Sequence, residues 1–473
     1  MTIKFGTDGW RGIIADDFTF SNVAACAQAV ADLTAERGLR GKPLIIGYDT
    51  RFASESFASV SAEVAAANGI HVLLSSTAVP TPVASYGVVH AGGAGAIVIT
   101  ASHNPPQWNG FKVKTQTGSS AEPAVTAELE QRITRLLAGN AVKRVPLAEA
   151  KKSGLVTIAD LETPYLDHLT QLVDLPELRA ARLKIAIDSM YGAGAGYLRK
   201  LLGGGSLDLT EMHGERNPAF PGMQQPEPIA HNLNALIDRV REERCSVGLA
   251  TDGDADRLGV VDENGEFLTQ LQVFALLSLY LLDVRGERGA LVKTTTTTSM
   301  IFRLAELYGV DAFETPVGFK YVAPVMMANN ALIGGEESGG YGFRGHIPER
   351  DGVLAGLYFL DFMVKTGKTP SQLIEYLYSK VGPHYYDRLD LDFDPAERQM
   401  IVDSFARPAP TEILGKNVVK IDRSEGIRLF LSDGSWLFVR LSGTEPVLRV
   451  YAESPGKEQS AGLLQVGKKL AGL

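Results

Sequence analysis

The chain has 473 residues, of which 45% are hydrophobic and 21% charged, and its net charge is −9. This length exceeds what one hydrophobic core supports and predicts three or four domains. The sequence has no lysine- or arginine-rich run, which argues against an extended nucleic-acid surface. Its most apolar segment, residues 273–282, is too short to span a membrane, and residues 1–10 lack an apolar signal-peptide core. We expect a cytoplasmic protein with neither nucleic acid nor membrane as a partner.

One pattern recurs along the first three quarters of the chain: an apolar strand, a short polar or glycine turn, and a helix. It occurs at residues 43–69, 183–202 and 290–309, and it predicts comparable α/β units. Residues 418–454 instead alternate strand-like runs with Glu-Gly, Asp-Gly and Ser-Gly-Thr turns, which is typical of antiparallel strands, and a helix follows. We predict α/β domains over 1–158, 159–267 and 268–385, and a smaller α+β domain over 386–473.

A serine loop follows the strand predicted at residues 95–99. The strand is an apolar run, and Asn-Pro-Pro and Asn-Gly turn signals follow it within residues 100–110. Ser102 is therefore placed on a tight loop at a strand end, where α/β proteins bind ligands. A plain turn serine is the alternative. The neighbouring His103 invites a serine hydrolase interpretation, but adjacent side chains rarely converge and no G-x-S-x-G motif is present.

An acidic loop between two apolar strands carries Asp252, Asp254 and Asp256. Three carboxylates this close repel one another unless a cation joins them, and hard oxygen ligands suit Mg²⁺ or Mn²⁺. A calcium EF-hand loop is one alternative, since Glu263 stands at the twelfth position. However, Arg257 replaces the required glycine and both flanks resemble strands. A solvated acidic turn is the other alternative.

Residues 333–352 place Glu336, Glu337 and Ser338 between glycine pairs. Carboxylates and a hydroxyl on such a backbone are good partners for the vicinal hydroxyls of a sugar. A glycine-rich surface turn with solvated glutamates explains this stretch equally well.

Residues 439–446 predict an anion site. Arg440 stands at a strand end, and the following turn contains Ser442, Gly443 and Thr444. A guanidinium, two hydroxyls and backbone N–H groups on one turn suit a phosphate, whereas a simple hairpin turn is the alternative. Two further cations, Arg11 and Lys112, either neutralise negative charge near Ser102 or lie on the surface.

Four motifs together resemble the α-D-phosphohexomutases, the phosphoglucomutase and phosphomannomutase superfamily. They are "TASHNP", "DGDADR", "GEESGG" and "RLSGTEP", in the family's order and across essentially the whole chain. The resemblance implies three related α/β domains with mixed sheets and a smaller C-terminal α+β domain around a large central cleft. It also implies an enzyme that acts on small sugar phosphates, as a monomer or a homodimer.

By this resemblance, Ser102 carries a phosphoryl group that moves to a hexose phosphate and returns through glucose 1,6-bisphosphate. One Mg²⁺ per chain is implied, held by Asp252, Asp254, Asp256 and a phosphoserine oxygen. Lys112 is the better candidate for the general acid/base, because burial lowers a lysine pKa.

The remaining residues receive supporting roles from the same resemblance. Arg11 flanks the phosphate and His103 orients it. Lys320, in "PVGFK", resembles the "GWK" pattern of phosphoglucomutases, although Phe319 replaces the tryptophan. The implied substrate-binding residues are Arg257, Lys320, Glu336, Ser338, Arg440, Ser442, Gly443 and Thr444.

The resemblance favours glucose as the hexose and allows mannose, because contacts to the 3- and 4-hydroxyls do not read the 2-position. Glutamate at position 337, where a glucosamine mutase is expected to carry glutamine, also favours glucose. A phosphoglucosamine mutase and a metal-dependent sugar phosphatase remain alternatives, and intact Ser102 and aspartates argue against a regulator that only binds sugar phosphates.

Overall fold

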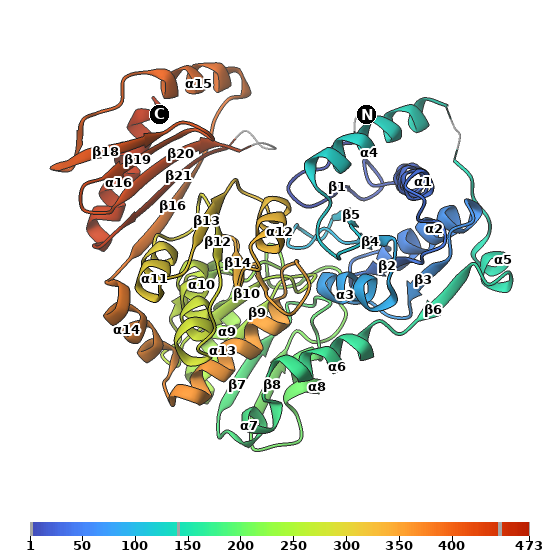
Figure 1. The fold of residues 1–473 in the computed structure, drawn as a ribbon, viewed down its shortest axis with the longest axis horizontal. Coiled ribbons are helices and arrows are strands. Elements are labelled where there is room, and N and C mark those ends of the chain that lie inside the picture. Colours follow the sequence, from blue (N-terminus) through green and yellow to red (C-terminus); the bar gives the residue numbers. More distant parts are fainter. Residues whose placement is uncertain (1–2, 140–141, 443–446, 473) are drawn as a thin grey trace.

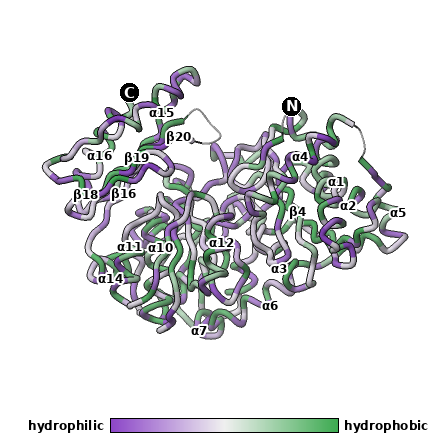
Figure 2. Tube along the Cα trace, turned by 45° about the horizontal axis from the view of Figure 1, so that its top comes forward, coloured by the Kyte–Doolittle hydropathy of each residue, from purple (hydrophilic) through white to green (hydrophobic). Residues whose placement is uncertain are grey.

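The computed structural model describes residues 3–139, 142–442 and 447–472, and these form four domains, each built on its own sheet (Figure 1). In Figure 1, domain I is blue to teal, domain II green, domain III yellow to orange and domain IV red. The mixed α/β fold class expected from the sequence is confirmed. Hydrophobic and hydrophilic stretches alternate along the trace in every domain, as expected for elements that bury one face (Figure 2).

Domain I has a six-stranded sheet in the order β1-β5-β4-β2-β3-β6. Strands β1 and β5 run antiparallel to their neighbours, and the other pairings are parallel. The strands are β1 (Trp10–Ile13), β2 (Leu44–Tyr48), β3 (Val72–Ser75), β4 (Gly95–Ile99), β5 (Trp108–Lys114) and β6 (Val156–Ala159). The helices are α1 (Phe20–Glu36), α2 (Ser54–Ala67), α3 (Thr81–Ala91), α4 (Pro123–Gly139) and α5 (Leu147–Lys152).

Domain II has a five-stranded mixed sheet in the order β11-β10-β9-β7-β8. Its strands are β7 (Lys184–Asp188), β8 (Asp208–Met212), β9 (Val247–Thr251), β10 (Leu258–Val261) and β11 (Phe267–Leu268). Its helices are α6 (Glu162–Leu172), α7 (Leu175–Ala180), α8 (Tyr197–Leu202), the 3₁₀ turn η1 (Ala230–Asn232) and α9 (Asn234–Glu243).

Domain III has four strands in the order β13-β12-β14-β15, of which only β15 runs antiparallel to its neighbour. They are β12 (Leu291–Thr294), β13 (Ala312–Thr315), β14 (Ile333–Gly335) and β15 (Tyr341–Phe343). The helices are α10 (Gln270–Leu279), which continues as the π-helical turn η2 (Tyr280–Val284), α11 (Met300–Tyr308), α12 (Phe319–Ala328), α13 (Gly352–Thr366) and α14 (Pro370–Val381). Helix α13 is apolar on nearly all sides, so it is buried on nearly all sides as well. The Asp351 side chain caps its N-terminus by accepting a hydrogen bond from the Leu354 N–H at 2.9 Å.

Domain IV has six strands, all antiparallel, in the order β16-β21-β20-β19-β18-β17. They are β16 (Tyr385–Asp392), β17 (Glu412–Ile413), β18 (Lys416–Asp422), β19 (Ile427–Leu431), β20 (Trp436–Leu441) and β21 (Val447–Ser454). The 3₁₀ turn η3 (Pro395–Glu397) and helices α15 (Arg398–Ala406) and α16 (Lys457–Leu470) complete it. The hairpin turns that the sequence predicts here therefore form an antiparallel sheet.

No helix in the described part of the chain is long and apolar enough to cross a membrane. Both cysteines are buried and free.

Candidate active site

The loop between β4 and β5 holds Ser102 in a constrained, buried position. Ser102 has a φ of +51°, in the left-handed region, and its side chain is 1% exposed. The buried Arg51 guanidinium donates to four carbonyls of this loop, those of Ser102, Asn104, Pro105 and Trp108, at 2.6–3.1 Å. Because one planar cation binds four carbonyls, the backbone that carries Ser102 is held in one place.

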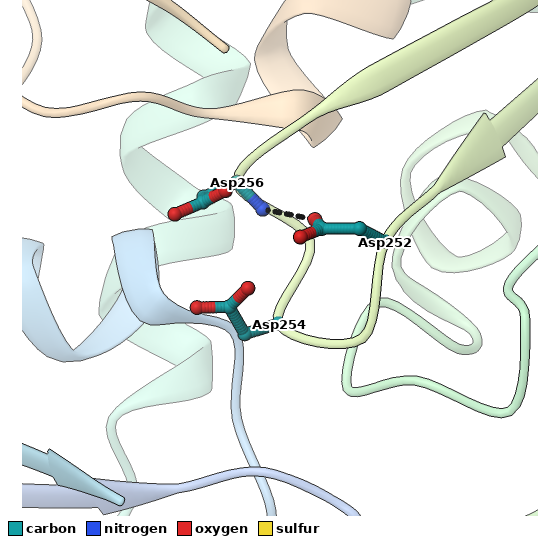
Figure 3. Close-up of side chains that lie close together, drawn as sticks. All are labelled: Asp252, Asp254 and Asp256. Atoms are coloured by element: carbon teal, nitrogen blue, oxygen red, sulfur yellow. Dashed lines mark hydrogen bonds between the residues drawn. The ribbon is translucent and has the colours of Figure 1, made fainter. Parts of the chain in front are cut away.

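The loop between β9 and β10 gathers three buried aspartates (Figure 3). One Asp252 oxygen accepts from the Asp256 N–H at 3.0 Å, drawn as a dashed line in Figure 3, and from the Arg257 N–H at 3.1 Å. Gly253 lets this loop approach the serine loop, since a Cβ there would lie 2.3 Å from the Ser102 carbonyl oxygen. The acidic loop of domain II is therefore packed directly onto the serine loop of domain I.

The aspartates fit a metal ion. One carboxylate oxygen from each of Asp252, Asp254 and Asp256 lies within 4.8 Å of the others. Oδ1 of Asp254 and Oδ1 of Asp256 are buried and accept no hydrogen bond from the described residues. Buried carboxylate oxygens without donors are costly, and a divalent cation would satisfy both. The three residues are thus able to hold a metal ion.

Ser102 is bonded directly to this acidic group. Its Oγ donates to Oδ2 of Asp252 at 2.7 Å and lies 3.3 Å from Nδ1 of His103. Burial and then the charges of Asp254 and Asp256 raise the pKa of Asp252 well above its ordinary value. Burial, together with the charges of Arg257, Arg11 and Arg51, lowers the pKa of His103 well below its usual range, so this imidazole is neutral at pH 7.

Lys112, on β5, lies among carboxylates from two domains. Its Nζ is 2.7 Å from Asp8, 2.7 Å from Asp254 and 3.1 Å from Asp256, and the side chain is 1% exposed. Burial alone would lower the lysine pKa, but these three carboxylates outweigh it and raise the pKa of Lys112. The lowered pKa that the sequence interpretation assumed is therefore wrong in this arrangement, and a general acid/base role for Lys112 stays a prediction.

Arg11 and Arg257 also reach the site. Arg11, on β1, donates to the Asn104 side chain in the serine loop, and burial with the nearby Arg257 charge lowers its pKa. Arg257 bonds to Glu227 at 2.6 Å, and its Nε lies 3.9 Å from both Asp252 and Asp256. Arg11 thus contacts the serine loop, and Arg257 lies close to the aspartates.

The loop between β14 and β15 brings Glu336 to the same centre. Glu336 is 6% exposed, and Oε2 lies 3.5 Å from Nη1 of Arg350. Burial raises the pKa of Glu336 to about 7, and the Arg350 charge opposes that shift. Ser338 is half-buried in the same loop. Lys320, at the start of α12, instead donates to the Gly6 carbonyl of domain I at 2.9 Å.

The residues predicted to bind a phosphate belong to domain IV. Arg440 lies on β20, and the Ser442 N–H closes the β20–β21 hairpin by donating to the Val447 carbonyl at 2.8 Å. Gly443 and Thr444 lie outside the described residues. The structure thus brings the site residues of domains I, II and III into contact, whereas Arg440 and Ser442 lie on a separate domain.

Sequence reasoning missed Arg350 and two of its partners, Asp8 and Glu349. Arg350 lies 2.5 Å from Asp8, 2.7 Å from Asp256, 3.2 Å from Glu349 and 3.5 Å from Glu336, so it joins all three domains. Arg350 lies within residues 333–352, the stretch considered for sugar binding, and Asp8 stands three positions before Arg11. Their charge and their position near predicted ligand-binding residues were the features of the sequence that could have marked them as site residues.

Models of one family match almost the whole chain. The phosphoglucomutase/phosphomannomutase α/β/α domains I, II and III match residues 2–139, 163–265 and 270–381, and the C-terminal domain of that family matches residues 397–466. A buried serine bonded to an acidic triad, on this four-domain fold, fits the phosphohexomutases. The chain belongs to the phosphoglucomutase/phosphomannomutase family, whose members are mutases of the isomerase class.

Individual relatives agree with this assignment. A phosphoglucomutase/phosphomannomutase of Thermococcus kodakarensis is 31% identical over 98% of both chains. A protein of Methanosphaera stadtmanae assigned as a phosphoglucosamine mutase is 29% identical over 96% of this chain and 95% of its own. The crystal structure of a Thermus thermophilus protein assigned as a phosphomannomutase covers 100% of both chains with a TM-score of 0.85 and 33% identity.

Proposed function

We propose that this enzyme interconverts hexose 1-phosphate and hexose 6-phosphate, with glucose favoured and mannose accepted, through phosphorylated Ser102 and a hexose 1,6-bisphosphate. The observation that carries the proposal is the bond from the buried Ser102 Oγ to Asp252 of the acidic triad. It places a hydroxyl that can carry phosphate beside a site that can hold a metal ion. The names of the relatives support hexose phosphates as the substrate class.

The reaction consists of two transfers at one serine. In the first, the bond from phosphorus to Ser102 Oγ breaks as a bond from phosphorus to the free sugar hydroxyl oxygen forms, and the hydroxyl proton ends on the departing Oγ. In the second, the bond from the other phosphorus to its sugar oxygen breaks, that phosphoryl group returns to Oγ, and the Oγ proton ends on the sugar oxygen. Serine suits both directions because its alkoxide and a sugar alkoxide are similar leaving groups.

The residues around Ser102 have distinct tasks in this proposal. Arg51 fixes the serine loop so that the attacking and leaving oxygens keep their alignment. Arg11 and Arg257 offset the charge of a phosphate on Ser102. Asp252, Asp254 and Asp256 would hold Mg²⁺, which when bound neutralises charge on the transferring phosphoryl group.

The sugar is assigned to the loop between β14 and β15. Glu336 and Ser338 would bind its 3- and 4-hydroxyls, while Arg440, Ser442, Gly443 and Thr444 would hold the phosphate that is not reacting. The Glu337 carboxylate accepts hydrogen bonds from Tyr386 and Arg388 of domain IV. We therefore do not expect this carboxylate to contact the sugar or to select between sugars. The preference for glucose over an amino sugar therefore needs a direct comparison of substrates.

Ser102→Ala tests the covalent step. We expect mutase turnover to fall by about 10⁴-fold or more, because the acceptor of the phosphoryl group is lost. Mass spectrometry after incubation with glucose 1,6-bisphosphate should show one added phosphate on the wild type and none on Ser102→Ala. Ser59→Ala, a serine on α2, is the matched control and should behave as the wild type. Full activity in Ser102→Ala would contradict the proposal.

Asp254→Asn tests the metal site. Calorimetric titration with MgCl₂ should show affinity at least about tenfold weaker than in the wild type, because one of three charged ligands is neutralised. Chelation should stop the wild-type reaction and added Mg²⁺ should restore it. The control is Asp238→Asn on α9, away from the aspartate loop, which should bind Mg²⁺ normally. Unchanged affinity in Asp254→Asn would show that the triad is not the metal site.

A phosphoglucosamine mutase is the second candidate, because a relative assigned to that activity matches 96% of the chain. A side-by-side assay of glucose, mannose, glucosamine and N-acetylglucosamine 1-phosphates decides between them by kcat/KM. We expect glucose and mannose to be preferred. A decisive preference for an amino sugar would replace the glucose assignment, and release of free phosphate from glucose 1-phosphate would indicate a phosphatase.

A further inference from the structure

Two adjacent glutamates in the loop between β14 and β15 face different domains. Glu336 faces Arg350 at the reacting centre. Glu337 instead accepts at Oε1 from Nη1 of Arg388 at 2.8 Å and from the Tyr386 hydroxyl at 3.1 Å, both on β16 of domain IV. One backbone segment therefore carries both the proposed sugar contact and a contact to the neighbouring domain.

Strand β16 is in register with the strand that carries Arg440. Arg388 pairs with Tyr451 of β21, which pairs with Phe438 of β20. Two residues further along, Asp390 pairs with Arg449, which pairs with Arg440. A hydrogen-bonded sheet moves as one body, so a shift of Arg388 relative to the sugar loop shifts Arg440 with it.

The pair is placed where it can break without unfolding either domain. The side chains of Arg388 and Glu337 are 37% and 20% exposed. Asp390 offers Arg388 a second carboxylate at 2.9 Å, so the guanidinium keeps a partner when Glu337 leaves. Partly exposed ion pairs contribute little to stability, and this one is suited to adjusting position rather than to holding the fold.

We propose that Glu337 and Arg388 are positioning residues that couple occupation of the sugar loop to the placement of Arg440. This inference rests on the proposed function, since the ligand is a sugar phosphate. A sugar bound at Glu336 and Ser338 orders the loop, Glu337 then holds Arg388, and the sheet of domain IV presents Arg440 to the second phosphate. Neither residue touches the reacting atoms.

Hydrogen exchange measured by mass spectrometry, with and without glucose 1-phosphate, tests the coupling without requiring turnover. In the wild type, the ligand should slow exchange in both residues 334–340 and residues 385–392. Arg388→Met removes the charge and the donors but keeps the apolar stem, and it should lose only the ligand effect at 385–392. Arg388→Lys keeps the charge and should restore at least half of it. Arg423→Met, an arginine whose partners are within domain IV, is the matched control.

Kinetics supply an independent readout. Arg388→Met should raise KM for glucose 1-phosphate by about fivefold, as expected for a partly exposed ion pair, and Arg388→Lys should recover most of it. If the ligand slows exchange at 385–392 equally in the wild type and Arg388→Met, or at 334–340 alone in the wild type, the coupling is overturned. If glucose 1-phosphate protects neither segment of the wild type, the proposed function itself fails.

Discussion

Apolar contacts join domains I, II and III to one another, whereas ion pairs and hydrogen bonds join domain IV to domain III. Domains I, II and III each have a hydrophobic cluster of their own, but all three also contribute to one shared apolar cluster, to which Val83 of α3, Leu249 of β9 and Leu360 of α13 belong. Domain IV has hydrophobic clusters of its own, and its contacts with domain III include Glu314–Arg428 at 2.7 Å and Thr295–Glu425 at 2.8 Å. Apolar interfaces resist relative motion, whereas small polar ones allow it.

This difference matches the division of chemistry proposed above. Ser102, the aspartate triad and Glu336 all lie on the three domains with a shared core, so the reacting groups keep their geometry. Arg440 lies on the domain with the polar interface, which suits a residue that must release product. A transfer step requires precise alignment, and a binding step requires access.

The polar interface is also built around buried charge. Glu314 bridges Lys293 of its own domain at 2.6 Å and Arg428 of domain IV, whose guanidinium stacks on Phe430 and Trp436. Burial and the Arg428 charge lower the pKa of Lys293 to about 8, against the opposing effect of Glu314. A buried cluster of this kind adds little to stability, because the cost of removing the charges from water offsets their mutual attraction.

Arg350→Met should have the largest effect on the three joined domains. The variant removes a cation that contacts Asp8, Asp256 and Glu336, and although Lys112 still contacts Asp8 and Asp256, removing one partner from a buried charge network typically costs about 3–5 kcal/mol. We expect the free energy of unfolding of domains I–III to fall by that amount, measured by denaturant titration, and turnover to fall as well. Arg344→Met, at a partly exposed ion pair with Glu287, should cost about 1 kcal/mol. Equal effects of the two variants would refute a special role for Arg350.

Much of this comparison could be predicted from the sequence. The β-hairpin signals of residues 418–454 set domain IV apart, and the turn signals after residue 99 placed Ser102 on its loop, because local propensities dictate both. The contact between Arg350 and Asp8 could not be predicted, since it joins residues 342 positions apart and depends on how the domains pack. The pKa of Lys112 was misjudged for the same reason: burial can be guessed from sequence, but the three neighbouring carboxylates cannot.

Leucine-to-alanine changes in the two kinds of core should separate their unfolding. Leu249 and Leu429 are both fully buried, the first in the shared core and the second in that of domain IV. Each change should cost about 3 kcal/mol from lost burial and the cavity left behind. In calorimetry, Leu249→Ala should lower the transition of domains I–III and Leu429→Ala that of domain IV. A single transition shifted equally by both would show that the four domains unfold as one.

The smallest effect we expect is on the pH dependence of KM, and it tests whether the Glu336 carboxylate binds the sugar. With a pKa raised to about 7 by burial, its carboxyl is protonated below pH 7 and ionised above. If the ionised form accepts a sugar hydroxyl, KM for glucose 1-phosphate should fall by a few-fold between pH 6 and pH 8, since charged acceptors bind more strongly. Glu336→Gln cannot titrate, so its profile should show only the ionisation of the substrate phosphate and of other groups. Subtracting that profile isolates Glu336, and identical profiles would show that its charge does not act on the sugar.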